Sequence, residues 1–238
     1  MIKYFHPLSR LLRQQNKFLS RDLPDAIRQC LNTPVIEKTT VMESLSFLVL
    51  DIETTGLDAD RDQILSIGWV EVNNLLVDLS TCKHFYIRGA TGINSESAVI
   101  NHITPEQLES GISLDEAFSM LLQDMQGKIM VAHGSMIEKS FLERFVRDKY
   151  ALSSLPIVWV DTLSLEKNFA HFRGAEASAD FRLSSVREQY GLPEYATHDA
   201  LTDAVSCAEL LLAQVERYFA QDARFFYSLY PLTQNRHQ

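Results

Sequence analysis

The chain has 238 residues, of which 46% are hydrophobic and 22% are charged, as in an ordinary globular protein. This length suits one large domain, or one domain with an appendage. No run approaches the roughly 18 apolar residues of a transmembrane helix, and the first residues lack the apolar core of a secretory signal. The formal net charge of −9 excludes a surface that grips nucleic acid mainly by counterion release. It leaves open an enzyme that makes few phosphate contacts.

Three cysteines, Cys30, Cys82 and Cys207, lie far apart in the chain and lack the spacing of a metal site. Unpaired cysteines in a chain of this size are typical of a reducing compartment. The pattern therefore predicts reduced thiols in a cytoplasmic protein.

The N-terminal segment is locally basic, and its leucines and phenylalanine recur near helical spacing. This pattern predicts an amphipathic helix within residues 1–22, and a second short helix is expected from about Pro24 to Leu31. Residues 1–44 then form a helical extension and linker to a main domain at 45–222, which a short tail at 223–238 follows. We expect the first helix to pack on the domain rather than to touch nucleic acid or a partner.

The main domain opens with a strand of unusual hydrophobicity. Phe47–Leu50 are all apolar and Ile52 extends the run past Asp51, which is typical of a central strand buried on both faces. Two further strands are expected in QILSIGWVEV and LLVDLSTCKHFYIR, with Asn73 and Asn74 as the turn between them. Together these strands predict a three-stranded antiparallel meander.

Helices and strands then alternate. Capping boxes at Thr104 and Ser113 open two helices, and a strand in KIMVAH precedes a helix over 136–150. A strand in PIVWVDT follows, and helices near 182–190 and 198–219 complete the domain. A meander followed by this alternation predicts an α/β fold, with a mixed sheet flanked by helices.

Two carboxylates end the central strand. Alternate residues of a strand point to the same face, so Asp51 and Glu53 converge at a strand end, where α/β sheets bind ligands. A divalent cation that prefers oxygen ligands, Mg²⁺ or Mn²⁺, would relieve their mutual repulsion. The spacing alone also fits acids that are merely solvated. The Thr-Thr-Gly that follows fits either a loop approached closely by a ligand or a simple turn.

Two later stretches carry further candidates. HDALTDAVSCAELL places Asp203 close to the buried stripe of the last helix and His198 in its first turn, where a neutral imidazole can accept a proton from water. VAHGSMIEKSFLERF places Glu138 near the start of a helix that follows a strand. Taken singly, each residue also has a structural explanation: a capping histidine, an exposed aspartate and an acid that favours the helix dipole.

Together the three stretches resemble the motifs of the DEDDh 3′–5′ exonucleases, the family of the proofreading epsilon subunit of bacterial DNA polymerase III. DIETTGL matches the first motif, D-x-E-T-T-G, without change. HDALTDA matches the third motif, H-x-x-L-x-D-A, with His198 and Asp203 in place. The order and spacing of the motifs agree over residues of about 45 to 220.

The second motif departs from the family pattern H-N-x-x-F-D-x-x-F-L. Gly134 replaces the usual Asn, Ile137 the usual Phe and Glu138 the usual Asp. The carboxylate is kept, with about 1.5 Å of extra reach from one more C–C bond. A contact to metal through water would absorb this reach, whereas a direct contact would lower activity. Asn101 and His102 also stand where the family usually has His-Gly.

The resemblance implies a ribonuclease H-like fold with a five-stranded mixed sheet of order 3-2-1-4-5. It also implies an exonuclease domain that releases nucleoside 5′-monophosphates from the 3′ end of DNA, single-stranded DNA above all, by hydrolysis with two Mg²⁺ or Mn²⁺ ions. By the same resemblance, the metal ligands are Asp51, Glu53, Glu138 and Asp203, and the general base is His198. The residues that would hold the last nucleotide are Thr54, Thr55, Gly56 and Leu57.

Three alternatives stay open at this point. The same type of enzyme could trim RNA or short oligoribonucleotides. Glu138 and Gly134 could mark a non-catalytic module that binds a nucleic-acid end or a polymerase, or the chain could be a purely structural domain. The expected partners are single-stranded nucleic acid 3′ ends, DNA rather than RNA, and a DNA polymerase or repair protein, with no membrane. The short aromatic tail favours a stand-alone or loosely associated exonuclease.

Overall fold

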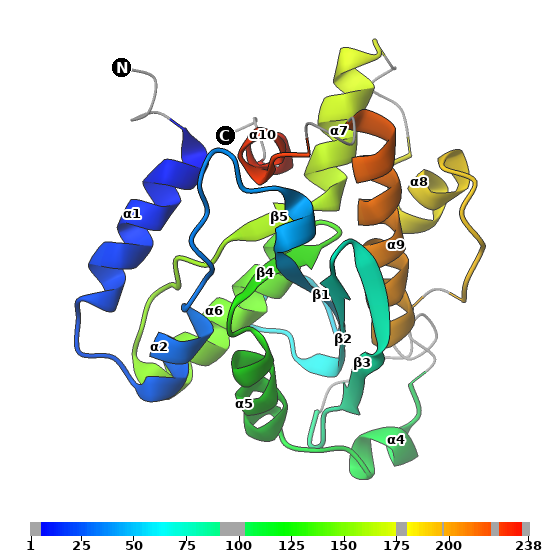
Figure 1. Cartoon of the computed structure of the whole chain (residues 1–238). Coiled ribbons are helices and arrows are strands. Elements are labelled where there is room, and N and C mark those ends of the chain that lie inside the picture. Colours follow the sequence, from blue (N-terminus) through cyan, green and yellow to red (C-terminus); the bar gives the residue numbers. More distant parts are fainter. Residues whose placement is uncertain (1–5, 91–102, 175–179, 197, 220–223, 235–238) are drawn as a thin grey trace.

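The computed structural model describes residues 6–90, 103–174, 180–196, 198–219 and 224–234. Within them, one mixed sheet lies between two layers of helices (Figure 1). Helices α2, α5 and α6 cover one face of the sheet, and α7, α8 and α9 lie on the other side. No helix of these residues is both long and apolar enough to cross a membrane.

The sheet has five strands in the order β3-β2-β1-β4-β5, which confirms the predicted fold class and topology. The strands are β1 Ser46–Thr54, β2 Ile64–Asn73, β3 Leu76–Tyr86, β4 Lys128–Ala132 and β5 Trp159–Asp161. β1 pairs with β2 and β2 with β3 in antiparallel fashion, whereas β1–β4 and β4–β5 are parallel. The hairpin turn lies at Asn74 and Leu75, both with a φ of 52°, one residue later than predicted.

The predicted helices occur in the predicted order, and the described residues form two further helices and two 3₁₀ turns. They are α1 Pro7–Leu19, α2 Asp25–Cys30, the 3₁₀ turn η2 Met42–Ser44, α4 Pro105–Glu109, α5 Leu114–Asp124, α6 Met136–Tyr150, α7 Thr162–Phe172, α8 Leu183–Gln189, α9 Ala200–Tyr218, α10 Phe226–Leu229 and the 3₁₀ turn η4 Tyr230–Thr233. The capping boxes at Thr104 and Ser113 are both formed. Helix α7 was not predicted, because the expected strand takes up the residues of its N-cap.

The central strand separates two apolar cores. Leu48 and Leu50 of β1 face the core under α5 and α6, whereas Phe47 and Val49 face the core under α9. All four side chains are at most 2% exposed. This alternation explains why the strand is a continuous apolar run. It also fixes the face on which Asp51 and Glu53 emerge, since they continue the register of Phe47 and Val49.

The basic helix α1 packs on the domain, as predicted. Leu8 is fully buried, in the same core as Phe226 and Leu229 of the C-terminal segment. Gln15 is buried as well, and its Nε2 donates to the carbonyl of Pro156 at 3.2 Å. The proposed boundaries of the extension, the main domain and the tail stay predictions.

Candidate active site

Asp51 and Glu53 emerge at the carboxyl end of β1, on the face that α9 covers. A glycine on the neighbouring strand sets the distance to that helix. Gly68 pairs with Asp51, and a Cβ at Gly68 would lie 2.4 Å from the backbone nitrogen of Leu201. Only a glycine therefore lets the start of α9 rest directly on the sheet. This role of Gly68 was not predicted from the sequence, although an isolated glycine within a strand signals a close backbone approach.

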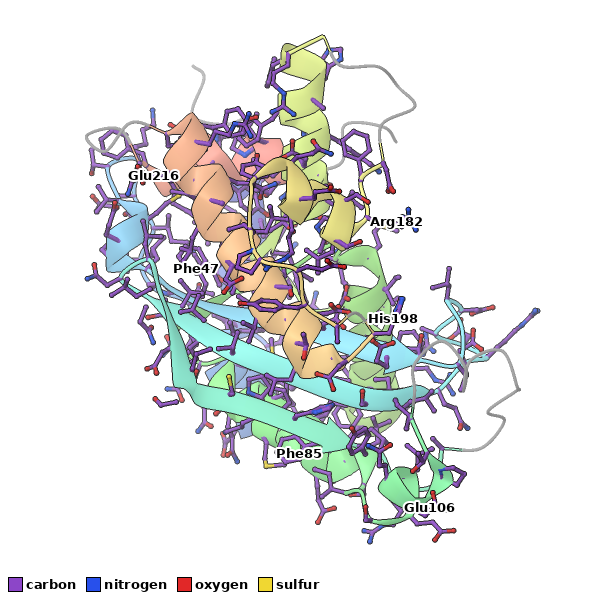
Figure 2. The ribbon with its side chains drawn as sticks, turned by 90° about the vertical axis from the view of Figure 1, so that its right-hand side faces the viewer. Phe47, Phe85, Glu106, Arg182, His198 and Glu216 are labelled. Carbon is purple, nitrogen blue, oxygen red and sulfur yellow. The ribbon has the colours of Figure 1, made fainter. Side chains whose placement is uncertain are left out.

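This close approach brings the third motif to the first. Glu53, His198 and Asp203 each offer a potential ligand atom, and these three atoms lie within 4.8 Å of one another. Figure 2 shows His198 at the end of α9 nearest to the sheet. Asp203 lies in the first turn of α9. The site thus joins a strand end, a helix start and the loop between α8 and α9.

The prediction that His198 lies in the first turn of the long helix is wrong. Asp199 is the N-cap of α9, and its carboxylate accepts from the backbone N–H of Thr202 at 2.9 Å. His198 precedes the helix with a φ of +66°, a conformation that histidine adopts more readily than most residues. Its backbone N–H donates to Asp203 Oδ2 at 3.0 Å, so the aspartate fixes the histidine's backbone.

Glu138 enters from the other side of β1. It is the third residue of α6 and only 5% exposed, and its Oε2 has no hydrogen-bond partner among the described residues. The turn before α6 contains Gly134 with a φ of +87°. The backbone N–H groups of Gly134 and Ser135 donate to the carboxylate of Asp161 at 3.0 and 3.2 Å. Asp161, which is 4% exposed, therefore anchors the turn that carries Glu138.

Burial is the main cause that raises the pKa of each of the four acids. Burial, with the charges of Asp203 and Asp199, raises the pKa of Glu53 to about 7. Burial raises the pKa of Glu138 to about 8. The pKa of Asp51 is raised well above its ordinary value, chiefly by burial and then by repulsion from Glu138. Burial also raises the pKa of Asp203, although the hydrogen bond from His198 opposes the effect.

These acids form a set that suits divalent cations. In the part of the chain that the structure describes, no lysine or arginine forms a salt bridge with Asp51, Glu53 or Glu138. Buried carboxylates are unfavourable unless a cation or a hydrogen bond compensates their charge. Glu138, with its unpartnered Oε2, and Glu53, with its ligand atom close to those of His198 and Asp203, are buried carboxylates that a cation would compensate. The donors are oxygens with one imidazole, a set that hard divalent ions accept.

Two threonine hydroxyls of the loop after Glu53 form hydrogen bonds within that loop. The hydroxyl of Thr54 donates to the carbonyl of Gly56 at 2.7 Å, and the hydroxyl of Thr55 donates to Asp62 Oδ1 at 3.1 Å. Leu57 is 75% exposed. The assignment of these residues to the last nucleotide stays a prediction, and Asn101 and His102, which stand where the family usually has His-Gly, lie outside the described residues.

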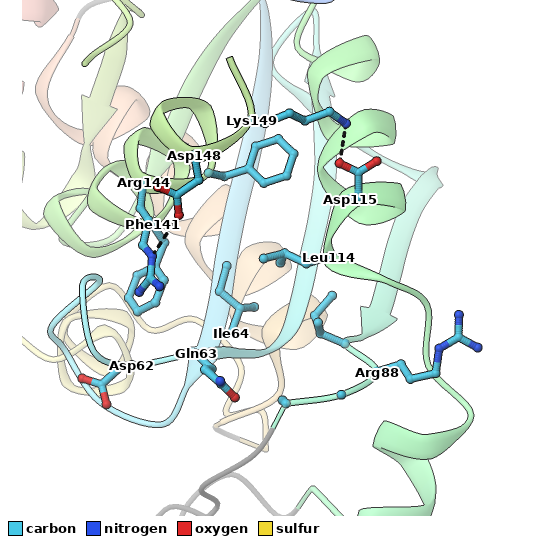
Figure 3. A pocket seen from close by; sticks show the side chains of 14 residues that line it. Asp62, Gln63, Ile64, Arg88, Leu114, Asp115, Phe141, Arg144, Asp148 and Lys149 are labelled. Atoms are coloured by element: carbon cyan, nitrogen blue, oxygen red, sulfur yellow. Dashed lines mark hydrogen bonds and ion pairs between the residues drawn. The ribbon is translucent and has the colours of Figure 1, made fainter. Parts of the chain in front are cut away.

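A separate hollow of about 520 Å³ lies on the other face of the sheet, between α5, α6 and the loop after β1 (Figure 3). Its floor is apolar and includes Ile64, Leu114 and Phe141. Neither His198 nor any of the four acids lines this hollow. The chemistry therefore belongs to the acid cluster on the α9 face.

Known proteins are similar to this chain in sequence. The sequence profile of the exonuclease family (RNase_T) matches residues 48–211. The PolC-type DNA polymerase III of Thermotoga petrophila is 34% identical over 176 residues, which are 73% of this chain and 12% of that protein. The DNA polymerase III subunit epsilon of Treponema pallidum is 31% identical over 190 residues, which are 76% of this chain and 82% of the subunit.

A solved structure shares the fold at low sequence identity. The zinc-bound form of the E. coli ExoI–ssDNA complex matches with a TM-score of 0.63 and 16% identity, over 73% of this chain and 41% of ExoI. The chain spans only about an eighth of the PolC-type relative, but most of the epsilon subunit.

Proposed function

Because this chain belongs to the DEDDh-type exonuclease family, we propose that it is a metal-dependent 3′–5′ exonuclease that acts on single-stranded DNA. Each turnover would release one nucleoside 5′-monophosphate from the 3′ end. The observation that carries the proposal is the meeting of Glu53, Asp203 and His198, with Glu138 close enough to Asp51 for its charge to raise the pKa of Asp51. Residues far apart in the chain supply these groups from separate elements.

The four acids would hold two Mg²⁺ or Mn²⁺ ions. When bound, such a pair of ions neutralises the acids and stabilises the attacking and leaving oxygens of the phosphodiester. Asp51, whose pKa is raised by burial and then by the charges of Glu138, Asp203 and Glu53, would be one of the residues that hold the ions. The zinc ion in the ExoI–ssDNA complex supports a divalent site in a related fold.

His198 would act as the general base. Its ring lies beside Glu53 and Asp203, and its backbone is tied to Asp203. The imidazole would take a proton from water as the water oxygen attacks phosphorus. The bond from phosphorus to the 3′ oxygen of the penultimate nucleotide then breaks, and that oxygen leaves with a proton. An exposed loop position before α9 lets the histidine exchange this proton with solvent.

The altered second motif is compatible with an active site. Gly134 has a φ of +87°, and glycine and asparagine are the residues that adopt positive φ most readily. Glycine in place of the family's Asn thus preserves the turn that leads into α6. Glu138 remains buried and points an unpartnered oxygen inward, which is unfavourable for a module that only binds.

The names of the relatives support a setting in DNA metabolism. Two are DNA polymerase III proteins, and ExoI was solved with single-stranded DNA. We therefore propose that the chain works with a DNA polymerase or a repair complex, in loose association. Co-elution with a polymerase on gel filtration, at micromolar concentration and in low salt, would test this association.

One substrate panel tests the activity. Single-stranded DNA, duplex DNA and RNA, each labelled at the 5′ end, are incubated with Mg²⁺ or Mn²⁺, with Asp203→Ala as the control. We expect a ladder of shortened single-stranded DNA with the wild-type protein alone. A ladder only on RNA would assign an exoribonuclease, and no ladder on any substrate would favour a binding module.

A further inference from the structure

A fifth carboxylate organises the loop that follows the first motif. Asp62 accepts the hydroxyl of Thr55 on Oδ1 at 3.1 Å and the backbone N–H of Asp58 on Oδ2 at 2.9 Å. The two ends of the loop also join directly. The N–H of Thr55 donates to the carbonyl of Gln63 at 2.9 Å, and the N–H of Gln63 donates to Thr55 Oγ1 at 3.0 Å.

The same carboxylate explains the glycine of the first motif. A Cβ at Gly56 would lie 2.5 Å from Asp62 Oδ2 and 2.6 Å from Oδ1. Contacts below 3.0 Å require the neighbour to move. Gly56 has no positive φ, so its backbone conformation alone would accept other residues. Asp62 and Gly56 thus fit each other: the carboxylate occupies the space that a side chain would need.

This arrangement leaves only part of the loop free for a ligand. The hydroxyls of Thr54 and Thr55 are engaged inside the loop, with Gly56 and Asp62 as their partners. Leu57 stands 75% exposed at the next position. What the loop can offer a nucleotide is therefore its backbone and the apolar surface of Leu57, and Asp62 holds both in place.

We propose that Asp62 is a positioning residue for substrate: it clamps residues 55–58 so that Leu57 and the loop backbone are preformed for the 3′-terminal nucleotide. This inference rests on the proposed exonuclease function. Among the described residues, the carboxylate of Asp62 forms hydrogen bonds with Thr55 and Asp58 and with none of the four acids or His198, so its effect should appear in substrate affinity rather than in chemistry. Preforming a binding loop raises affinity because less freedom is lost on binding.

The test compares Asp62→Ala with the matched control Asp60→Ala. Asp60 lies in the same loop, but its carboxylate pairs with Arg147 rather than with residues 55–58. Steady-state kinetics are measured with Mn²⁺ on a single-stranded oligonucleotide and on bis(p-nitrophenyl) phosphate, a phosphodiester without a nucleoside. We expect Asp62→Ala to raise KM for the oligonucleotide about tenfold, with kcat and the rate on the small diester unchanged.

A double-mutant cycle separates positioning from a general structural effect. Gly56→Ala alone should raise KM and lower the melting temperature, because its methyl group meets the Asp62 carboxylate. In the Asp62→Ala background the same substitution should change neither quantity, since the obstacle is gone. The melting temperatures test the steric coupling even without activity.

Wild-type kinetics with Asp62→Ala, or equal effects of Gly56→Ala in both backgrounds, would overturn the positioning role while leaving the exonuclease proposal intact. A fall in kcat on both substrates would also overturn it, because Asp62 would then act on the chemistry. A wild-type protein that degrades no oligonucleotide at all would instead remove the proposed function.

Discussion

Replacing Glu53 by glutamine should stabilise the metal-free protein at neutral pH. Glu53 is 8% exposed, and burial raises its pKa from 4.5 to about 7. A carboxyl whose folded pKa is raised contributes stability below the unfolded value, and this stability is lost as the pH rises through the folded value. The window for Glu53 is therefore about pH 4.5 to 7. The difference of about 2.5 pH units, at about 1.4 kcal/mol each, corresponds to about 3 kcal/mol.

Thermal unfolding in EDTA measures this effect. At about 2–4 °C per kcal/mol for a chain of this size, Glu53→Gln should melt about 6–12 °C above the wild type at pH 8, and at nearly the same temperature at pH 4.5. Glu109→Gln on the exposed end of α4 is the matched control and should change nothing. Excess Mn²⁺ should reverse the order at pH 8, because only the wild type gains a full ligand set. A Glu53→Gln protein that melts below the wild type at pH 8 in EDTA would refute the reasoning.

Variants at three further residues test single positions. His198→Ala should slow the chemical step by about 10²–10⁴-fold with an unchanged melting temperature, and an unchanged single-turnover rate would remove it as the base. Glu138→Asp should withdraw a buried carboxylate by about 1.5 Å and raise the Mn²⁺ concentration needed for half-maximal activity. An equal or lower Mn²⁺ concentration would show that the length of the side chain at position 138 does not limit metal binding. Gly134→Ala should lower the free energy of unfolding in urea by about 1–2 kcal/mol, and Gly134→Asn should lower it by less. The reason is that the positive φ, and not a lack of space, disfavours a side chain at this position. Equal losses for the two variants would contradict this reasoning.

The sequence was informative where local chemistry decides the structure. The apolar run before Asp51 predicted a central strand, since a strand buried on both faces has no polar side. The capping boxes at Thr104 and Ser113 predicted helix starts, because the bonds they make lie within four residues. The order of the sheet followed from the family resemblance, and the structure confirms it.

The sequence was less informative where distant segments meet. The function of Gly68 depends on a helix more than a hundred residues later. Asp161 was visible as an acid at a strand end, but its two roles, the N-cap of α7 and the anchor of the turn before α6, depend on tertiary contacts. The last helix was predicted to begin two residues too early, at His198, because a left-handed residue before an N-cap has no periodic signature.

The most direct test of a metal-dependent 3′–5′ exonuclease is the identity of the first product. A single-stranded oligonucleotide with a radiolabelled phosphate at its last internucleotide bond is incubated with the wild type and with Asp51→Asn, which keeps the shape of the side chain without its charge. We predict that the wild type releases the label as a nucleoside 5′-monophosphate with Mg²⁺ or Mn²⁺ and not in EDTA, and that Asp51→Asn releases none. Release in EDTA, or equal release by Asp51→Asn, would contradict the assignment of these acids to a metal site.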